Sequence, residues 1–316
     1  MTYLRTKLRI MQLKGVFQEK GYYHQFLILV MLVLLSTGFF MVLWFMSLPG
    51  IFGIDTIKNP AAISEYNNPE VIRAISTWQV IQAFATFIIP AFLMAWLTST
   101  EKPTQYLVLD TKPNIKALLV AGLIMFAALP FINWMGFVNS KMSLPDSMHW
   151  MEEWMKNAED QAALLTKSFL SITSVGDLLF KIIMMALLPA IGEELLFRGV
   201  VQRLFYRWLN NIHIAVILSA VLFSAMHMQF FGFIPRMAMG VALGYMFAFT
   251  GSIWVPIFAH FVNNASVVIF TYAGWTAADT LGAEPNDLLI TLASMVTTIL
   301  LMYVLSTKFK SRASIE

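Results

Sequence analysis

The chain has 316 residues, of which 58% are hydrophobic and 12% charged, and its mean hydropathy is +0.69. About a quarter of the residues in soluble domains are charged, so this composition excludes a soluble globular protein. The net charge is only +3 and cysteine is absent. There is no nucleic-acid-binding module or glycine-rich phosphate loop, and disulfides, thiolate catalysis and cysteine metal ligands are excluded.

Long apolar segments follow one another along the whole chain. A spanning helix needs roughly 20 apolar residues, and the first run, 26–48, is too long for the core of a signal peptide. We therefore expect an all-α fold, a polytopic membrane helical bundle with about eight transmembrane helices. The predicted spans are residues 26–48, 78–98, 115–138, 178–207, 213–234, 236–250, 253–273 and 287–306.

Some spans carry residues that affect helix packing. Pro90, Pro130 and Pro189 fall inside spans, where neighbouring helices must satisfy the backbone groups that proline leaves free. Gly240 and Gly244 form a small-xxx-small pattern, which predicts close packing of the sixth span against a neighbour.

Basic residues indicate the orientation of the bundle. With the N-terminus in the cytoplasm, fourteen Lys or Arg fall in or beside inner segments and six in or beside outer ones. Cytoplasmic loops are enriched in Lys and Arg. We therefore expect an integral protein of a bacterial cytoplasmic membrane with both termini in the cytoplasm.

One predicted helix does not span the membrane. Between residues 148 and 169, Trp, Met and Ala recur at helical spacing with acidic and basic residues between them. Such a helix is typical of the membrane interface, and we place it on the outer side. We divide the chain into residues 1–175, an N-terminal membrane region with three spans and this helix, and residues 176–316, a catalytic membrane core and C-terminal span.

The fourth span contains two adjacent acids and an arginine. Each charge at the centre of a bilayer costs roughly 2.5–3.5 kcal/mol on insertion scales, so these groups need partners. Glu194 and Arg198 are four residues apart and share a helix face, which predicts an internal, structural ion pair. Glu193 points elsewhere and has no local basic partner. It is the candidate general base.

Two further spans carry polar residues at similar depth. Phe223 and His227 lie four apart on the fifth span, and His260 and Asn264 four apart on the seventh. Counted from the cytoplasmic ends of the helices at 1.5 Å per residue, Glu193 and His227 lie about 21 Å deep, His260 about 12 Å and Asn264 about 18 Å. Each alone is typical of helix packing. Together they predict a site, with His260 and Asn264 as donors toward an oxyanion.

The three motifs, in this order on successive polar helices, resemble those of the CAAX protease and bacteriocin-processing (Abi) family of intramembrane endopeptidases. The resemblance covers about residues 181–272. The motifs are Glu193-Glu194-xxx-Arg198, Phe223-xxx-His227 and His260-xxx-Asn264.

This resemblance implies a role for each motif residue. Glu193 would activate a water molecule that His227 helps to hold or activate, the acid–arginine pair would support the site, and His260 and Asn264 would stabilise the oxyanion. It implies a peptide or lipid-modified protein substrate, a lipid bilayer as environment, and no metal or other cofactor.

Two alternatives remain. Glu193, His227 and His260 could form a zinc site with two histidines and one carboxylate, although the His-Glu-x-x-His pattern of zinc proteases is absent. The chain could also be a non-catalytic membrane scaffold or a transporter, because transporters keep ionisable groups at mid-membrane.

Overall fold

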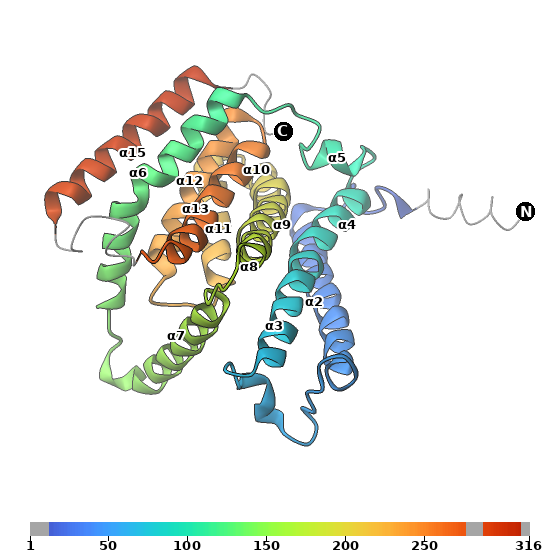
Figure 1. The fold of residues 1–316 in the computed structure, drawn as a ribbon. Coiled ribbons are helices and arrows are strands. Elements are labelled where there is room, and N and C mark those ends of the chain that lie inside the picture. Colours follow the sequence, from blue (N-terminus) through green and yellow to red (C-terminus); the bar gives the residue numbers. More distant parts are fainter. Residues whose placement is uncertain (1–12, 276–286, 311–316) are drawn as a thin grey trace, which may run out of the picture.

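The computed structural model describes residues 13–275 and 287–310, and within them every regular element is helical (Figure 1). The first twelve residues, with three of the basic residues used for orientation, lie outside this part. The polytopic helical bundle is confirmed. The α-helices are α2 (Tyr22–Ser47), α3 (Pro69–Gln82), α4 (Ile89–Thr98), α5 (Pro103–Tyr106), α6 (Ile115–Ser140), α7 (His149–Phe169), α8 (Val175–Ile182), α9 (Leu188–Leu196), α10 (Arg203–Leu209), α11 (Ile212–Ala225), α12 (Phe233–Thr250), α13 (Trp254–Tyr272) and α15 (Leu288–Lys308).

Several helices join end to end into spans. Among the described residues, seven helical segments are long and apolar enough to cross a membrane. α11, with 14 residues, is a shorter apolar helix. The seven are Tyr22–Phe52, Pro69–Thr98, Ile115–Ser140, Val175–Leu209, Phe233–Thr250, Trp254–Tyr272 and Leu288–Lys308.

The predicted fifth span, 213–234, is too long, because α11 ends at Ala225. The backbone turns away at Met228, which has a φ of +53°, an uncommon left-handed conformation for a residue other than glycine. The side chain of His227 donates from Nδ1 to the carbonyl of Phe223 (2.8 Å). In a continuing helix the His227 amide would bond that carbonyl. His227 therefore lies in the loop after the helix and not on the span.

Proline residues in the spans are accommodated in two ways. Pro90 and Pro189 each lie two residues after the end of a π-helical segment, η3 (Ala83–Ile88) and η5 (Ile183–Leu187). The wider turn of such a segment suits a backbone that cannot form every i−4 hydrogen bond. Pro130 lies inside α6. There Ser294 of α15 donates to the Ala127 carbonyl (2.5 Å) and accepts from the Phe131 amide (3.1 Å), so a neighbouring helix compensates, as predicted.

The close packing predicted for Gly240 and Gly244 is confirmed. A Cβ atom on Gly240 would lie 3.2 Å from Cα of Ala220 in α11, and one on Gly244 would lie 2.9 Å from Oε1 of Gln202. The bare glycine backbone also accepts hydrogen bonds. Gln202 donates to the Gly244 carbonyl at 3.0 Å. Gln202 is in η6 (Phe197–Gln202), the π-helical segment between α9 and α10. The glycines therefore bring α12 within reach of the polar fourth span.

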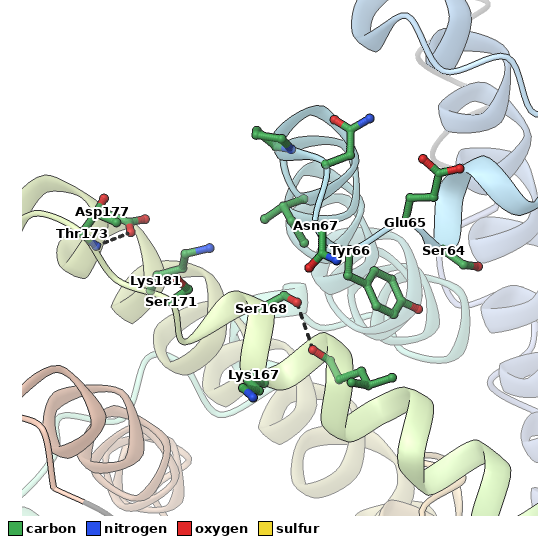
Figure 2. Close-up of a pocket in the computed structure, with 14 residues that line it drawn as sticks. Ser64, Glu65, Tyr66, Asn67, Lys167, Ser168, Ser171, Thr173, Asp177 and Lys181 are labelled. Carbon is green, nitrogen blue, oxygen red and sulfur yellow. Dashed lines mark hydrogen bonds between the residues drawn. The ribbon is translucent and has the colours of Figure 1, made fainter.

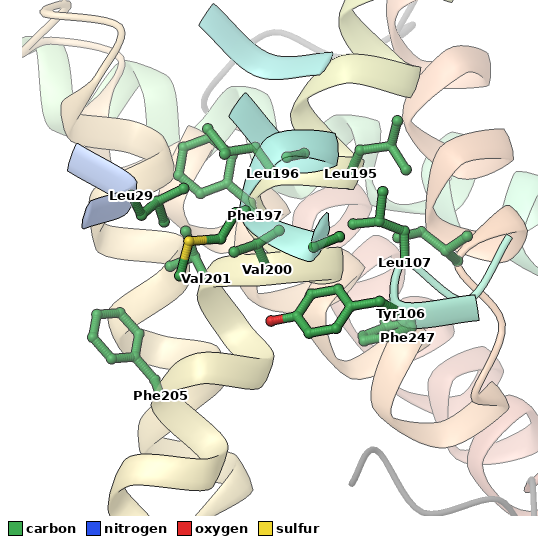
Figure 3. Close-up of a cluster of buried hydrophobic side chains, with 14 of the residues drawn as sticks. Leu29, Tyr106, Leu107, Leu195, Leu196, Phe197, Val200, Val201, Phe205 and Phe247 are labelled. Carbon is green, nitrogen blue, oxygen red and sulfur yellow. The ribbon is translucent and has the colours of Figure 1, made fainter. Parts of the chain in front are cut away.

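The core beside the acidic motif is apolar. Leu195, Leu196 and Phe197 continue directly from the two acids and pack with Leu107 and Phe247 in one buried cluster (Figure 3). In a bilayer, where lipid chains are as apolar as these side chains, close van der Waals packing stabilises such a cluster. The cluster fixes the fourth span against its neighbours and so fixes where the acids point.

The predicted helix over 148–169 is confirmed as α7 (Figure 1). The Trp154 ring lies 5.3 Å from that of Phe230, in the loop after α11. On another face of α7, Lys156 donates to Glu152 at 2.6 Å, and this contact lowers the pKa of Glu152. α7 therefore covers the loop that carries His227.

Candidate active site

The acid–arginine pair is completely enclosed. Arg198 Nη1 donates to Glu194 Oε1 at 2.9 Å, and its Nη2 donates to the Gly240 carbonyl at 2.9 Å. The guanidinium carbon lies 5.0 Å from the centre of the Phe223 ring. Both members of the pair are at most 1% exposed. The pair thus joins the fourth span to α12 and to the end of α11, although Arg198 Nε has no hydrogen-bond partner within the described residues.

His260 joins α13 to both acids. Its Nδ1 lies 2.9 Å from Glu194 Oε1, and its Nε2 lies 3.9 Å from Glu193 Oε2. A carboxylate oxygen accepts, so Nδ1 carries the proton in this contact. Nε2 can then donate only when the ring is an imidazolium with a proton on each nitrogen. The sequence pattern predicted that His260 acts together with Asn264, but it did not predict the hydrogen bond between His260 and Glu194.

The two acids differ in their partners. Glu194 Oε1 accepts from both Arg198 and His260. The Oε2 atoms of Glu193 and Glu194 are both buried and have no hydrogen-bond partner within the described part of the chain. Glu193 is 7% exposed and borders two cavities. Glu194 is 0% exposed and borders neither cavity, so Glu193 is the acid that a molecule bound in these cavities can reach.

His227 is oriented by the last turn of the preceding helix, α11. Because the Phe223 carbonyl accepts from Nδ1, Nε2 is the nitrogen left available, and in a neutral ring it is an acceptor. The Phe223 ring lies 5.1 Å from the ring of His227 and 5.9 Å from that of His260. One phenyl group thus packs against both imidazoles and spaces them.

The four candidate catalytic residues surround one cavity. Glu193, His227, His260 and Asn264 all line a space of about 300 Å³. Asn264 accepts at Oδ1 from Nδ2 of Asn263 (3.1 Å), which leaves the amide N–H groups of Asn264 available. The structure therefore brings together residues from three separate segments of the chain.

A second cavity, of about 240 Å³, lies on the other side of Glu193 and His227, which line both. Its opposite wall includes Gln79 and Gln82 of α3. The N-terminal region therefore contributes to the site, although its sequence carried no motif that we assigned. Two glutamines in an apolar span were the available signal, because polar side chains in spans usually face protein or a cavity.

Other contributors also went unrecognised in the sequence. Asn139 of α6 donates to the Phe230 carbonyl (3.2 Å) and accepts from the Ile234 amide (2.8 Å), so it fixes both ends of the loop segment before α12. Arg236, which lines the 300 Å³ cavity, donates to the Gln229 side chain at 2.5 Å. These contacts hold the loop that positions His227.

The zinc alternative can be compared with this geometry. In residues 13–275 and 287–310, no group of three or more His, Asp or Glu side chains is arranged to hold a metal ion. His260 Nδ1 and His227 Nδ1 are both bonded to protein acceptors. The described residues thus do not form a preassembled metal centre.

The comparisons with known proteins match the same part of the chain. The family described as "Type II CAAX prenyl endopeptidase Rce1-like" matches residues 175–266. "Putative membrane peptidase YdiL" of Bacillus subtilis (strain 168) is 35% identical over 88 residues, 28% of this chain and 36% of that protein. "Uncharacterized protein YpbD" of the same organism is 36% identical over 88 residues, 27% of this chain and 42% of that protein.

These matches cover only part of each protein. The chain spans about four-tenths of the length of the curated relatives that it matches, and no solved structure matches it significantly. The matched segment contains the acidic motif, both site histidines and Asn264. Residues 175–266 are therefore an Rce1-like segment, and the resemblance to the CAAX protease and bacteriocin-processing family is confirmed over this segment.

Proposed function

We propose that this chain is an intramembrane endopeptidase that cleaves a peptide or lipid-modified protein near the membrane with a water molecule activated by Glu193. One observation carries the proposal. Glu194 is fully buried and bonded through Oε1 to Arg198 and His260, whereas Glu193 borders the cavity that it shares with His227, with an Oε2 that no hydrogen bond joins to the described residues. A general base must reach the proton that it abstracts.

The proposed reaction needs only groups that the site supplies. Glu193 takes a proton from water while His227 Nε2 holds that water, and the hydroxide adds to the peptide carbonyl. The carbonyl oxygen becomes an oxyanion. When it re-forms the double bond, the C–N bond breaks, and protonated Glu193 returns its proton to the leaving amine. Glu193 thus acts as base and then as acid, and the products are a carboxylic acid and an amine.

The oxyanion is assigned to Asn264 and His260. The oxygen of Asn264 accepts from Asn263, and no hydrogen bond within the described residues occupies its amide N–H groups. His260 donates from Nε2 in its imidazolium form, with Glu194 fixing the opposite ring nitrogen. Donors fixed in advance around a developing charge are among the strongest catalytic contributions.

Asn264→Asp tests this assignment, because it keeps the shape of the side chain and removes its N–H donors. We expect kcat to fall by about 10²–10³-fold, the effect of losing one oxyanion donor, with little change in KM. The measurement uses purified protein in proteoliposomes and a library of membrane-anchored peptides, with new termini identified by mass spectrometry. Thr271→Val, an exposed change on the same helix, is the control. An undiminished kcat for Asn264→Asp would remove Asn264 from the mechanism.

Metal removal tests the zinc alternative. A carboxylate base and two hydrogen-bond donors to the oxyanion are sufficient for the proposed reaction. Cleavage should therefore persist after treatment with 1,10-phenanthroline and dialysis. Metal content is measured on the same sample by mass spectrometry. Loss of cleavage that zinc restores would instead assign Glu193, His227 and His260 as metal ligands.

A further inference from the structure

A larger cavity lies apart from the candidate active site, where α8 begins (Figure 2). Its volume is about 1260 Å³. One wall consists of residues 64–69 and 72, at the start of α3, and the other of residues from the end of α7 to Lys181 of α8. None of the four candidate catalytic residues lines it.

A buried lysine faces this cavity. Lys181 is 4% exposed, and its Nζ lies 5.3 Å from the centre of the Phe169 ring and 5.9 Å from that of Phe180. Figure 2 shows its amino group turned toward the space between α8 and the start of α3. No hydrogen bond or ion pair joins Nζ to any residue in the described part of the chain. Aromatic faces attract a cation only weakly, so this ammonium lacks a fixed anionic partner.

The depth of the cavity points to the headgroups of the bilayer. The span Val175–Leu209 has 35 residues, which corresponds to about 52 Å of helix. The hydrocarbon core is only about 30 Å thick. Lys181 is six residues from the start of this span, so an upright helix places it at headgroup level. The phosphates of lipids lie at the same level.

The charges on the walls are mixed. Lys167 and Lys181 supply two ammonium groups, and Glu65 and Asp177 supply two carboxylates. A simple anion would meet the lysines but also both carboxylates. A ligand with a phosphate and an ammonium group satisfies all four side chains by opposite charge.

We propose that this cavity binds the headgroup of a zwitterionic aminophospholipid. Its phosphodiester is bound by Lys181 and Lys167, and its ammonium group by Glu65 and Asp177. The lipid chains extend from the cavity into the adjacent leaflet. The bound lipid fills the gap between the start of α3 and α8 and so fixes the N-terminal helices against the matched core.

Native mass spectrometry of the full chain, released from vesicles of defined composition, tests the proposal. The probes are phosphatidylethanolamine, phosphatidylglycerol, which lacks the amine, and diacylglycerol, which lacks the phosphate. We expect the wild type to retain phosphatidylethanolamine in preference to both. Lys181→Met should lower this retention about tenfold or more, the effect of losing one charge-assisted hydrogen bond, and Lys181→Arg should keep most of it.

Lys141→Met is the matched control. Lys141 also lies over a phenyl ring, that of Phe137 at 5.3 Å, but does not line this cavity, so its replacement should leave lipid retention unchanged. If Lys181→Met does not fold, the exposed Lys167→Met should still weaken retention. Equal retention by wild type and the cavity variants, or equal retention of diacylglycerol, would overturn the proposal. Displacement of the lipid by millimolar inorganic phosphate or by an acidic peptide would also overturn it, by assigning the site to a free anion or to a peptide.

Discussion

Replacing Glu193 with glutamine should abolish peptide cleavage, lowering kcat by about 10²–10⁴-fold, the usual contribution of a general base. Glutamine has the same shape but cannot accept the proton of the attacking water. The protein should remain folded, with a Tm equal to or above that of the wild type, because the change removes a buried charge whose Oε2 has no partner within the described residues. The two quantities are measured as cleavage in proteoliposomes and thermal unfolding in detergent.

The control is Glu153→Gln, which removes an exposed carboxylate from α7 and should change neither quantity. Undiminished cleavage by Glu193→Gln would contradict the base assignment. A large fall in Tm would show that Glu193 supports the fold. Comparing peptides that accumulate in cells with wild-type and Glu193→Gln protein would then identify the substrate.

Replacing Glu194 with glutamine should damage stability as well as activity. The change leaves the guanidinium of Arg198 buried without an opposite charge and weakens the contact that orients His260. Breaking a buried ion pair on one side typically costs about 3–5 kcal/mol. We therefore expect a lower Tm, together with reduced cleavage, in the same two measurements.

A double replacement distinguishes charge from packing. Glu194→Gln combined with Arg198→Met removes both charges, so Tm should recover toward the wild-type value while cleavage stays low because His260 is no longer held. Glu152→Gln breaks a comparable i,i+4 pair with Lys156, but one that is partly exposed, and should change Tm little. A normal Tm for Glu194→Gln would show that the pair contributes nothing to the fold.

The features that followed from the sequence are local ones. The spans could be predicted because hydrocarbon demands long apolar helices with internally satisfied backbones. The pairing of Glu194 with Arg198 could be predicted because residues four apart are neighbours on a helix. The depth argument counted His227 along a continuous helix, whereas α11 ends two residues earlier, at Ala225.

The features that were missed depend on contacts between distant segments. His260 is 66 residues from Glu194, and no periodicity within a helix reveals that its ring would bind that acid. The end of α11 at Ala225 was not predicted, because the residues that follow it are still largely apolar. Hydropathy also does not reveal that the His227 side chain bonds the Phe223 carbonyl. Gly240 was recognised as a packing residue, but its carbonyl as an acceptor for Arg198 depends on how closely two helices approach.

The second cavity has a consequence for how relatives diverge. Gln79 and Gln82 belong to α3, outside the segment that matches the Rce1-like family, yet they face the same space as Glu193. In the proposed reaction, the catalytic residues and the cavity wall that would contact the substrate peptide thus lie in separate segments of the sequence. Substitutions in the cavity wall can therefore change which peptides bind without changing the catalytic residues.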